Sequence, residues 1–272
     1  MGHVRKDADV DGLVVPYFDP RRIARGSTTF LIGKRGTGKT KLIVDIMAFF
    51  RHCSYAVVIC PTIEASNTYA QHIPEAFIYK NWKPSIVDNV MAAQQKLDSE
   101  ELEQCPCLLV FDDCLFDPKF AKHISTRNLY MNGRHANITV ICAGQYMMDL
   151  PPAIRTNTDF VFVLADNNRV NREKVYRNFG GVFPAFKAFD EVMRQCTGDF
   201  NCLVLDNKTA SNNIEECVAY YKATLNLRYK VGSKDLWTYA EQLSDYAAEN
   251  VIAPDPDSNA PHIIKRQPPR YR

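Results

Sequence analysis

The sequence predicts an α/β protein with a doubly wound, mostly parallel sheet, and three features lead to this prediction. Short apolar runs typical of fully buried strands recur along the chain. Segments with helical spacing of apolar residues lie between most of these runs, as the crossovers between parallel strands require. With 272 residues, 46% hydrophobic and 24% charged, the chain is long enough to bury one main core.

The first expected unit is a strand over 28–32, then a glycine-rich loop, then a helix over 39–50 with Leu42, Ile43 and Ile46 at helical spacing. Further buried strands are expected over 56–61, 107–114, 138–145 and 159–164. Helices are expected over 85–104, 118–132 and 168–195. Two later apolar runs, FNCLVLD and CVAYYKATL, predict an added C-terminal strand pair on the sheet.

Composition suggests how the chain is divided. Residues 1–27 are polar and interrupted by prolines, so an N-terminal arm or edge segment is expected there. The main domain is expected over 28–230, a C-terminal helix over 231–252, and a flexible, basic, proline-rich tail over 253–272.

Several classes of protein are excluded or disfavoured. No apolar run approaches the roughly 20 residues that cross a bilayer, and the first residues lack the apolar segment of a secretion signal, so a reducing compartment is expected. Cys60, Cys107, Cys142 and Cys202 lie in apolar runs and are expected to be buried. Cys105 and Cys107 have no second pair at zinc spacing, so a zinc site is not expected. The net charge of +2 does not by itself indicate nucleic-acid binding.

The stretch GKRGTGKT matches GxxxxGK[ST] in full and has the required strand before it and helix after it. In such a loop the backbone amides and the helix N-terminus bind the β-phosphate. Lys39 is expected to contact the β- and γ-phosphates, and the Thr40 hydroxyl to ligate Mg²⁺. The sequence therefore predicts a P-loop NTPase fold. The expected nucleotide-binding residues are Gly33, Lys34, Arg35, Gly36, Thr37, Gly38, Lys39, Thr40 and Lys41.

Two adjacent carboxylates follow the buried run CLLVF. At the carboxyl end of a parallel strand, Asp112 is expected to hold the magnesium shell. Asp113 is expected to orient or deprotonate the attacking water. The alternative is helix capping by Asp113 or Asp117, which the four preceding apolar residues disfavour. Gln145 ends the next expected strand, where its amide could bond the γ-phosphate or the water.

Three sets of basic residues compete to neutralise transition-state charge. Lys34 and Arg35 lie in the loop, Arg134 precedes the strand over 138–145, and Arg155 follows it. A guanidinium from a neighbouring subunit can accelerate phosphoryl transfer about a thousandfold or more.

Together these motifs resemble the DNA-packaging ATPases of the nucleocytoplasmic large DNA viruses, the poxvirus type, within the FtsK and HerA superfamily. The resemblance covers residues 28–223 and rests on GKRGTGKT, VVICPT, CLLVFDDC, NGRHANITVICAGQ, CLVLDN and ECVAYYKA. It implies a homo-oligomeric ring that uses ATP and Mg²⁺ to drive double-stranded DNA, without sequence preference, into a preformed capsid. It also implies a capsid or virion-membrane partner, and a location in viral factories of the host cytoplasm or in the virion.

The same resemblance implies residue roles. Lys39 and Thr40 correspond to the phosphate and magnesium residues, Asp112 to the metal aspartate, Asp113 to the water-activating carboxylate and Gln145 to the polar sensor. The superfamily usually has glutamate where this chain has Asp113, so the shorter side chain would act through an intervening water.

Arginine and DNA contacts remain open at this level. Arg134 is the first choice for an arginine acting across a subunit interface, and Arg155 the second. DNA contact is expected from residues 119–134 or from a basic group comprising Arg169, Arg172, Lys174 and Arg177.

Two other functions share the glycine loop. A small-molecule kinase would phosphorylate an acceptor hydroxyl and would not respond to DNA. An ATP-gated scaffold would bind nucleotide to assemble, with little turnover. A GTPase is disfavoured because Asn207-Lys208 continues as Thr209-Ala210 rather than as NKxD.

Overall fold

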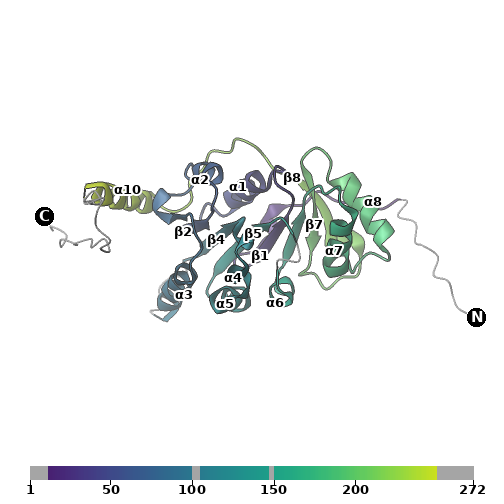
Figure 1. Ribbon diagram of the computed structural model, residues 1–272, viewed down its shortest axis with the longest axis horizontal. Helices are drawn as coiled ribbons and strands as arrows, with labels where there is room; N and C mark the ends of the chain where they lie inside the picture. The colour runs from purple at the N-terminus through teal and green to yellow at the C-terminus, as the bar shows by residue number, and fades with distance from the viewer. Residues whose placement is uncertain (1–11, 100–104, 147–149, 250–272) are drawn as a thin grey trace, which may run out of the picture.

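One eight-stranded sheet organises the computed structural model, which describes residues 12–99, 105–146 and 150–249 (Figure 1). The strand order is β3-β2-β4-β5-β1-β6-β7-β8. Strands β1 to β6 pair in parallel, whereas β7 is antiparallel to β6 and β8 to β7. The predicted parallel sheet with an added strand pair is confirmed. The strands are β1 (Thr28–Ile32), β2 (Tyr55–Ile59), β3 (Ile78–Tyr79), β4 (Cys107–Asp112), β5 (Ile138–Gly144), β6 (Phe160–Val163), β7 (Asn201–Asp206) and β8 (Val218–Lys222).

Helices cover both faces of the sheet. In Figure 1, α1 (Lys39–Phe49) and α2 (Ile63–Tyr69) lie above it. The opposite face packs against α3 (Pro84–Ser99), α4 (Pro118–Lys122), α5 (Ile124–Asn132), α6 (Pro152–Arg155), α7 (Arg169–Phe179) and α8 (Phe186–Cys196). Short elements complete the described chain: η1 (Pro20–Arg22), η2 (Glu75–Phe77), η3 (Cys114–Phe116) and α9 (Ile214–Cys217), with α10 (Lys234–Glu249) after β8.

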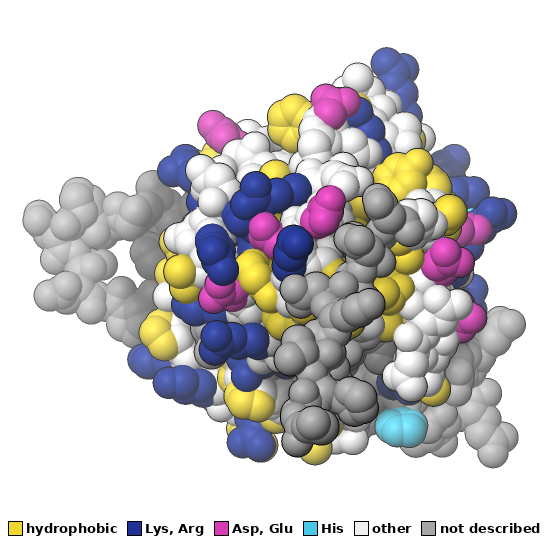
Figure 2. Space-filling model, turned by 90° about the vertical axis from the view of Figure 1, so that its right-hand side faces the viewer, with side chains coloured by type: hydrophobic (Ala, Val, Ile, Leu, Met, Phe, Trp, Pro, Cys, Tyr) yellow, Lys and Arg dark blue, Asp and Glu magenta, His cyan; other side chains and the backbone are white. Residues whose placement is uncertain are grey.

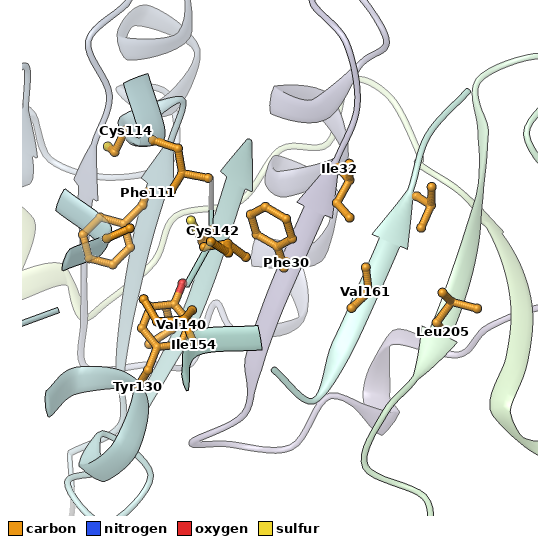
Figure 3. Close-up of a cluster of buried hydrophobic side chains, with 14 of the residues drawn as sticks. Phe30, Ile32, Phe111, Cys114, Tyr130, Val140, Cys142, Ile154, Val161 and Leu205 are labelled. Atoms are coloured by element: carbon orange, nitrogen blue, oxygen red, sulfur yellow. The ribbon is translucent and has the colours of Figure 1, made fainter. Parts of the chain in front are cut away.

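Two buried clusters follow from the alternation of side chains along the strands. Phe30 and Leu31 of β1 are both fully buried, but they point into different clusters on the two faces. Figure 3 shows the first cluster, in which Phe30, Phe111, Cys142 and Val161 extend from the same side of neighbouring strands. Because both faces are covered, the strands read as continuous apolar runs. The cysteines predicted to be buried are buried.

Two expected helices are each divided in two. His123 has an extended backbone (φ −67°, ψ 145°) that separates α4 from α5, and its Nδ1 accepts a hydrogen bond from Ser125 N at 3.2 Å, capping α5. The segment expected as one helix over 168–195 forms two helices: α7 ends before Gly180, and α8 begins after Pro184. The short elements α2, β3 and α6 were not predicted, because they contain too few residues to show a period.

The chain before β1 and the chain after β8 both contact the α1 side of the sheet. Phe18 is buried in the second cluster, and its amide donates to Tyr220 O at 2.8 Å, so residues 16–18 form an edge segment along β8. After β8 the chain reaches α10, which extends from the β2 end of the molecule (Figure 1). Trp237 Nε1 donates to Val231 O at 2.9 Å and holds the start of α10. The predicted tail over 253–272 lies outside the described residues. Within the described residues, no helix combines the length and apolar character needed to cross a bilayer.

Candidate active site

The glycine-rich loop over 33–40 joins the carboxyl end of β1 to the start of α1. Gly36 and Gly38 have φ values of +81° and +94°, a conformation that side-chain-bearing residues rarely adopt. A Cβ at Gly33 would lie 2.6 Å from Thr37 Oγ1, so a side chain there would require Thr37 to shift. The loop is thus folded as the phosphate-binding motif predicts, with Gly38 at the N-terminus of α1.

Lys39 places a buried ammonium inside this loop. Its side chain is 6% exposed, and Nζ donates to Gly33 O at 2.8 Å and to Lys34 O at 3.2 Å. Asp113 Oδ1 lies 3.8 Å from the same nitrogen. The ammonium therefore lies at the centre of the loop and beside one of the two acids predicted to act on the nucleotide.

Asp112 ends β4 and is only 2% exposed. Its Oδ2 accepts hydrogen bonds from Thr40 Oγ1 at 2.8 Å and from Tyr69 Oη at 2.9 Å. Burial raises the pKa of Asp112, and the hydrogen bonds from Thr40 and Tyr69 oppose that rise. A hydroxyl and a carboxylate that meet at one point beside the loop form the hard oxygen set that Mg²⁺ prefers, so these residues fit the predicted metal.

Asp113 follows Asp112 with a left-handed backbone (φ +56°), and its amide donates to Ala143 O at 3.3 Å. This conformation turns the two neighbouring carboxylates to different places: Asp112 into the core beside Thr40, and Asp113 toward Lys39. Asp113 makes no side-chain cap to η3, whereas Asp117 caps α4 by accepting from Lys119 N at 2.9 Å. Helix capping is therefore the role of Asp117 and not of Asp113.

Gln145 lies at the carboxyl end of β5, directly beside β4. It is exposed and, with Asp113, lines a cavity of about 200 Å³ whose other walls include Gly144 and Tyr146. An amide in this position faces the same space as the second acid. The sheet thus brings Lys39, Thr40, Asp112, Asp113 and Gln145 to one edge, as predicted from the sequence.

The other basic residues of the loop differ in their surroundings. Lys34 Nζ forms an ion pair with Asp166 Oδ1 at 2.9 Å, whereas Arg35 and Lys41 are exposed. Lys34 is therefore tied to the segment after β6, and Arg35 extends from the loop into solvent.

Arg134 and Arg155 lie at the opposite, amino edge of the sheet. Arg134 Nη2 pairs with Asp159 Oδ1 at 2.9 Å, just before β6, and Arg155 Nη1 donates to Leu150 O at 2.9 Å. The five residues of β1 separate the two edges by about 17 Å. Neither arginine reaches the loop of its own subunit, so a role for either one requires a neighbouring copy.

Two buried residues of the site region were not predicted from the sequence. Tyr69 of α2 is fully buried, and desolvation raises its pKa well above the usual value. Asp45 of α1 is 2% exposed; it accepts hydrogen bonds from the Tyr221 hydroxyl and from Thr224 N, the latter at 3.1 Å. Burial raises the pKa of Asp45, and these hydrogen bonds oppose the rise. Asp45 thus links the helix of the phosphate loop to the last strand. Its sequence signal is an acid at an apolar position of the helix.

The glycine loop after β1, the acid pair at the end of β4 and the parallel sheet that unites them define a P-loop NTPase fold. No family model matches the chain. The chain is 31% identical over 227 residues to uncharacterized protein L437 of Acanthamoeba polyphaga mimivirus, covering 80% of each chain. It is 36% identical over 219 residues to uncharacterized protein 015R of Frog virus 3, covering 79% of this chain and 68% of that protein.

The chain belongs to the same family as these proteins of large DNA viruses. Among solved structures, the genome packaging NTPase B204 from Sulfolobus turreted icosahedral virus 2, in complex with ATP-gammaS, has a similar fold. Its TM-score is 0.54 at 14% identity, covering 76% of this chain and 100% of that chain. The resemblance to viral packaging ATPases is confirmed in the fold and in the viral origin of the relatives.

Proposed function

We propose that this protein is an ATP-hydrolysing motor that moves double-stranded viral DNA into the capsid during virion assembly. The observation that carries the proposal is the convergence of Lys39, Thr40, Asp112 and Asp113 at one edge of the sheet. Thr40 Oγ1 lies 2.8 Å from Asp112 Oδ2, and Lys39 Nζ lies 3.8 Å from Asp113 Oδ1. Binding and hydrolysis of a triphosphate need these groups within one crevice.

Each group has a separate task when ATP is bound. The loop amides and Lys39 hold the β- and γ-phosphates, and Thr40 with Asp112 holds Mg²⁺. The ion neutralises charge that develops on the phosphate oxygens. Asp113, 32% exposed and so open to water, orients or deprotonates the attacking water. Gln145 senses the γ-phosphate, and loss of that contact after hydrolysis relaxes the subunit interface.

Three observations support DNA as the partner. The relatives come from large DNA viruses, and B204 is a genome packaging NTPase. Figure 2 shows the α7–α8 end of the molecule, where Lys and Arg side chains are numerous. Exposed members of this end include Lys174 and Arg177 of α7. A duplex bound to such a surface is held through its phosphates, so binding weakens with salt.

Arg172 does not belong to that DNA surface. Its side chain is 4% exposed, and it pairs with Asp190 and donates to Asp166 O at 2.9 Å. The buried guanidinium joins α7 to α8 and to the segment after β6. Of the expected basic group on α7, Arg169, Lys174 and Arg177 remain as DNA candidates.

A homo-oligomeric ring accounts for the position of the arginines. If the amino edge of one subunit faces the carboxyl edge of the next, Arg134 or Arg155 approaches the neighbouring nucleotide. We place the ring at viral factories in the host cytoplasm or in the virion, with a capsid or virion-membrane component as its docking partner.

Displacement of a triplex-forming oligonucleotide from duplex DNA tests the motor directly. The wild-type protein should release the third strand only with ATP and Mg²⁺, and Lys39→Ala should not release it. If the protein hydrolyses ATP but displaces no third strand at any salt concentration tested, the result would contradict translocation.

A further inference from the structure

A strained turn between α8 and β7 displays an aromatic ring to solvent. Phe200 is 70% exposed, and both Asp199 (φ +51°) and Phe200 (φ +58°) have left-handed backbones. A left-handed backbone is unfavourable for residues other than glycine, and Asp tolerates this conformation better than Phe. Exposure of the ring adds no burial to offset that cost. Unfavourable backbone geometry of this kind concentrates at ligand sites.

Contacts on both sides hold the turn in place. Asn201 N donates to Gly198 O at 3.0 Å and closes the turn. Lys222 Nζ of β8 pairs with Asp199 Oδ2 at 2.5 Å. These two contacts link the turn to the first residue of β7 and to the neighbouring strand.

The ring lies against the phosphate loop. A Cβ built at Gly38 would be 3.7 Å from Phe200 Cδ1, an ordinary van der Waals distance. Gly38 is the last loop residue before Lys39 and caps α1. Phe200 is thus an exposed aromatic side chain next to the proposed phosphate-binding loop, although it lies 162 residues after Gly38 in the sequence.

The order of the strands determines which end of a nucleotide would meet this ring. Asp112 ends β4, Asp113 follows it and Gln145 follows β5. Both strands lie on one side of β1. β6 and β7 lie on the other side, and Phe200 immediately precedes β7. Because β7 is antiparallel to β6, its first residues lie at the carboxyl edge where the loop lies. A nucleotide with its γ-phosphate beside Asp113 would therefore have Phe200 on the other side of β1, where its ribose and base would lie.

We propose that Phe200 is the stacking platform for the nucleobase. Its flat, exposed ring binds the base by stacking, which tolerates different bases because each has a π-face. The turn keeps the ring in place before nucleotide binds, so little side-chain freedom is lost on binding. This inference rests on the proposed binding of ATP at the glycine loop.

The test compares two ligands by isothermal titration in the presence of Mg²⁺: ATP, which has a base, and inorganic tripolyphosphate, which has none. Phe200→Ala should weaken ATP binding by about 5- to 150-fold, the range that removal of one base–aromatic stack gives. Its affinity for tripolyphosphate should stay within about twofold of wild type. Phe200→Gly, which suits the left-handed backbone, should behave in the same way. Tyr239→Ala removes another exposed aromatic side chain, from α10, and should change neither affinity.

Phe200→Trp provides a second readout and a rescue. It should restore ATP affinity, and its fluorescence should change on addition of ATP but not of tripolyphosphate. If Phe200→Ala weakens the binding of both ligands equally, or leaves ATP affinity unchanged while the wild type binds ATP, this inference alone is overturned. A wild type that binds neither ligand would overturn the proposed function as well.

Discussion

The hydroxyl of Thr40 donates to Oδ2 of Asp112 at 2.8 Å, although 72 residues separate them in the sequence. Thr40 is the second residue of α1 and Asp112 is the last residue of β4, so the contact joins the phosphate loop to the acid pair. Tyr69 donates to the same oxygen from α2 at 2.9 Å. Three elements thus converge on one carboxylate oxygen, and this convergence makes the edge of the sheet a candidate catalytic crevice.

Asp113→Asn should retain ATP binding and lose at least about 100-fold in hydrolysis rate, because the amide no longer accepts the proton of the attacking water. Binding by calorimetry and phosphate release measure the two effects. Asp117→Asn changes a nearby helix cap of the same residue type and is the matched control. Hydrolysis by Asp113→Asn at the wild-type rate would exclude Asp113 as the base.

Tyr69→Phe should lower the free energy of unfolding by about 1–3 kcal/mol, because it removes a hydrogen bond to a buried carboxylate. It should also weaken Mg²⁺-dependent ATP binding, because Asp112 Oδ2 then loses the hydrogen bond from Tyr69 and keeps only the one from Thr40. Urea denaturation and calorimetry check the two results. Tyr79→Phe, at an exposed position of β3, is the control and should leave both quantities unchanged. If Tyr69→Phe loses stability but keeps the wild-type Mg²⁺ dependence of ATP binding, Tyr69 has only a structural role.

Asp45→Asn should alter how stability depends on pH. Burial raises the pKa of Asp45, so its favourable contribution is complete below the unfolded pKa of about 3.9 and is lost as pH rises through the raised value. The variant carries no such ionisation. Its stability relative to wild type should therefore increase from pH 4 to pH 7.5 in urea denaturation. Asp88→Asn, at an exposed position of α3, should show no trend, and a flat difference for Asp45→Asn would contradict the assigned burial effect.

Arg134→Ala should abolish ATP hydrolysis by the proposed ring without changing the phosphate loop, because Arg134 lies at the amino edge of its own sheet. Mixed with Asp113→Asn subunits, it should recover part of the hydrolysis activity, since some interfaces then combine an intact acid with an intact arginine. Arg155→Ala in the same mixtures identifies which arginine acts. Complete inactivity at every mixing ratio would argue against action across the interface.

The sequence predicted most of the sheet because each buried strand is a continuous apolar run. Such a run can be recognised without knowing which strand it pairs with. It predicted the loop and the acids because Gly33, Gly38 and Asp112 occupy fixed positions relative to those runs. It did not predict Tyr69 or Asp45, because their partners lie 43 and 176 residues away. Phe200 was also not predicted, because its proposed role depends on its backbone φ and on its proximity to Gly38. Neither feature has a sequence pattern.

The rate of ATP hydrolysis with and without duplex DNA, measured together with the mass of the nucleotide-bound protein, tests the central claim most directly. We predict that an oligomer hydrolyses ATP in the presence of Mg²⁺ and that duplex DNA stimulates this hydrolysis. Salt should weaken the stimulation, and Lys39→Ala should abolish the hydrolysis. Turnover that DNA does not change, with a phosphorylated small-molecule acceptor as product, would indicate a kinase. Nucleotide-dependent assembly without turnover would indicate a scaffold, and either result would contradict the motor.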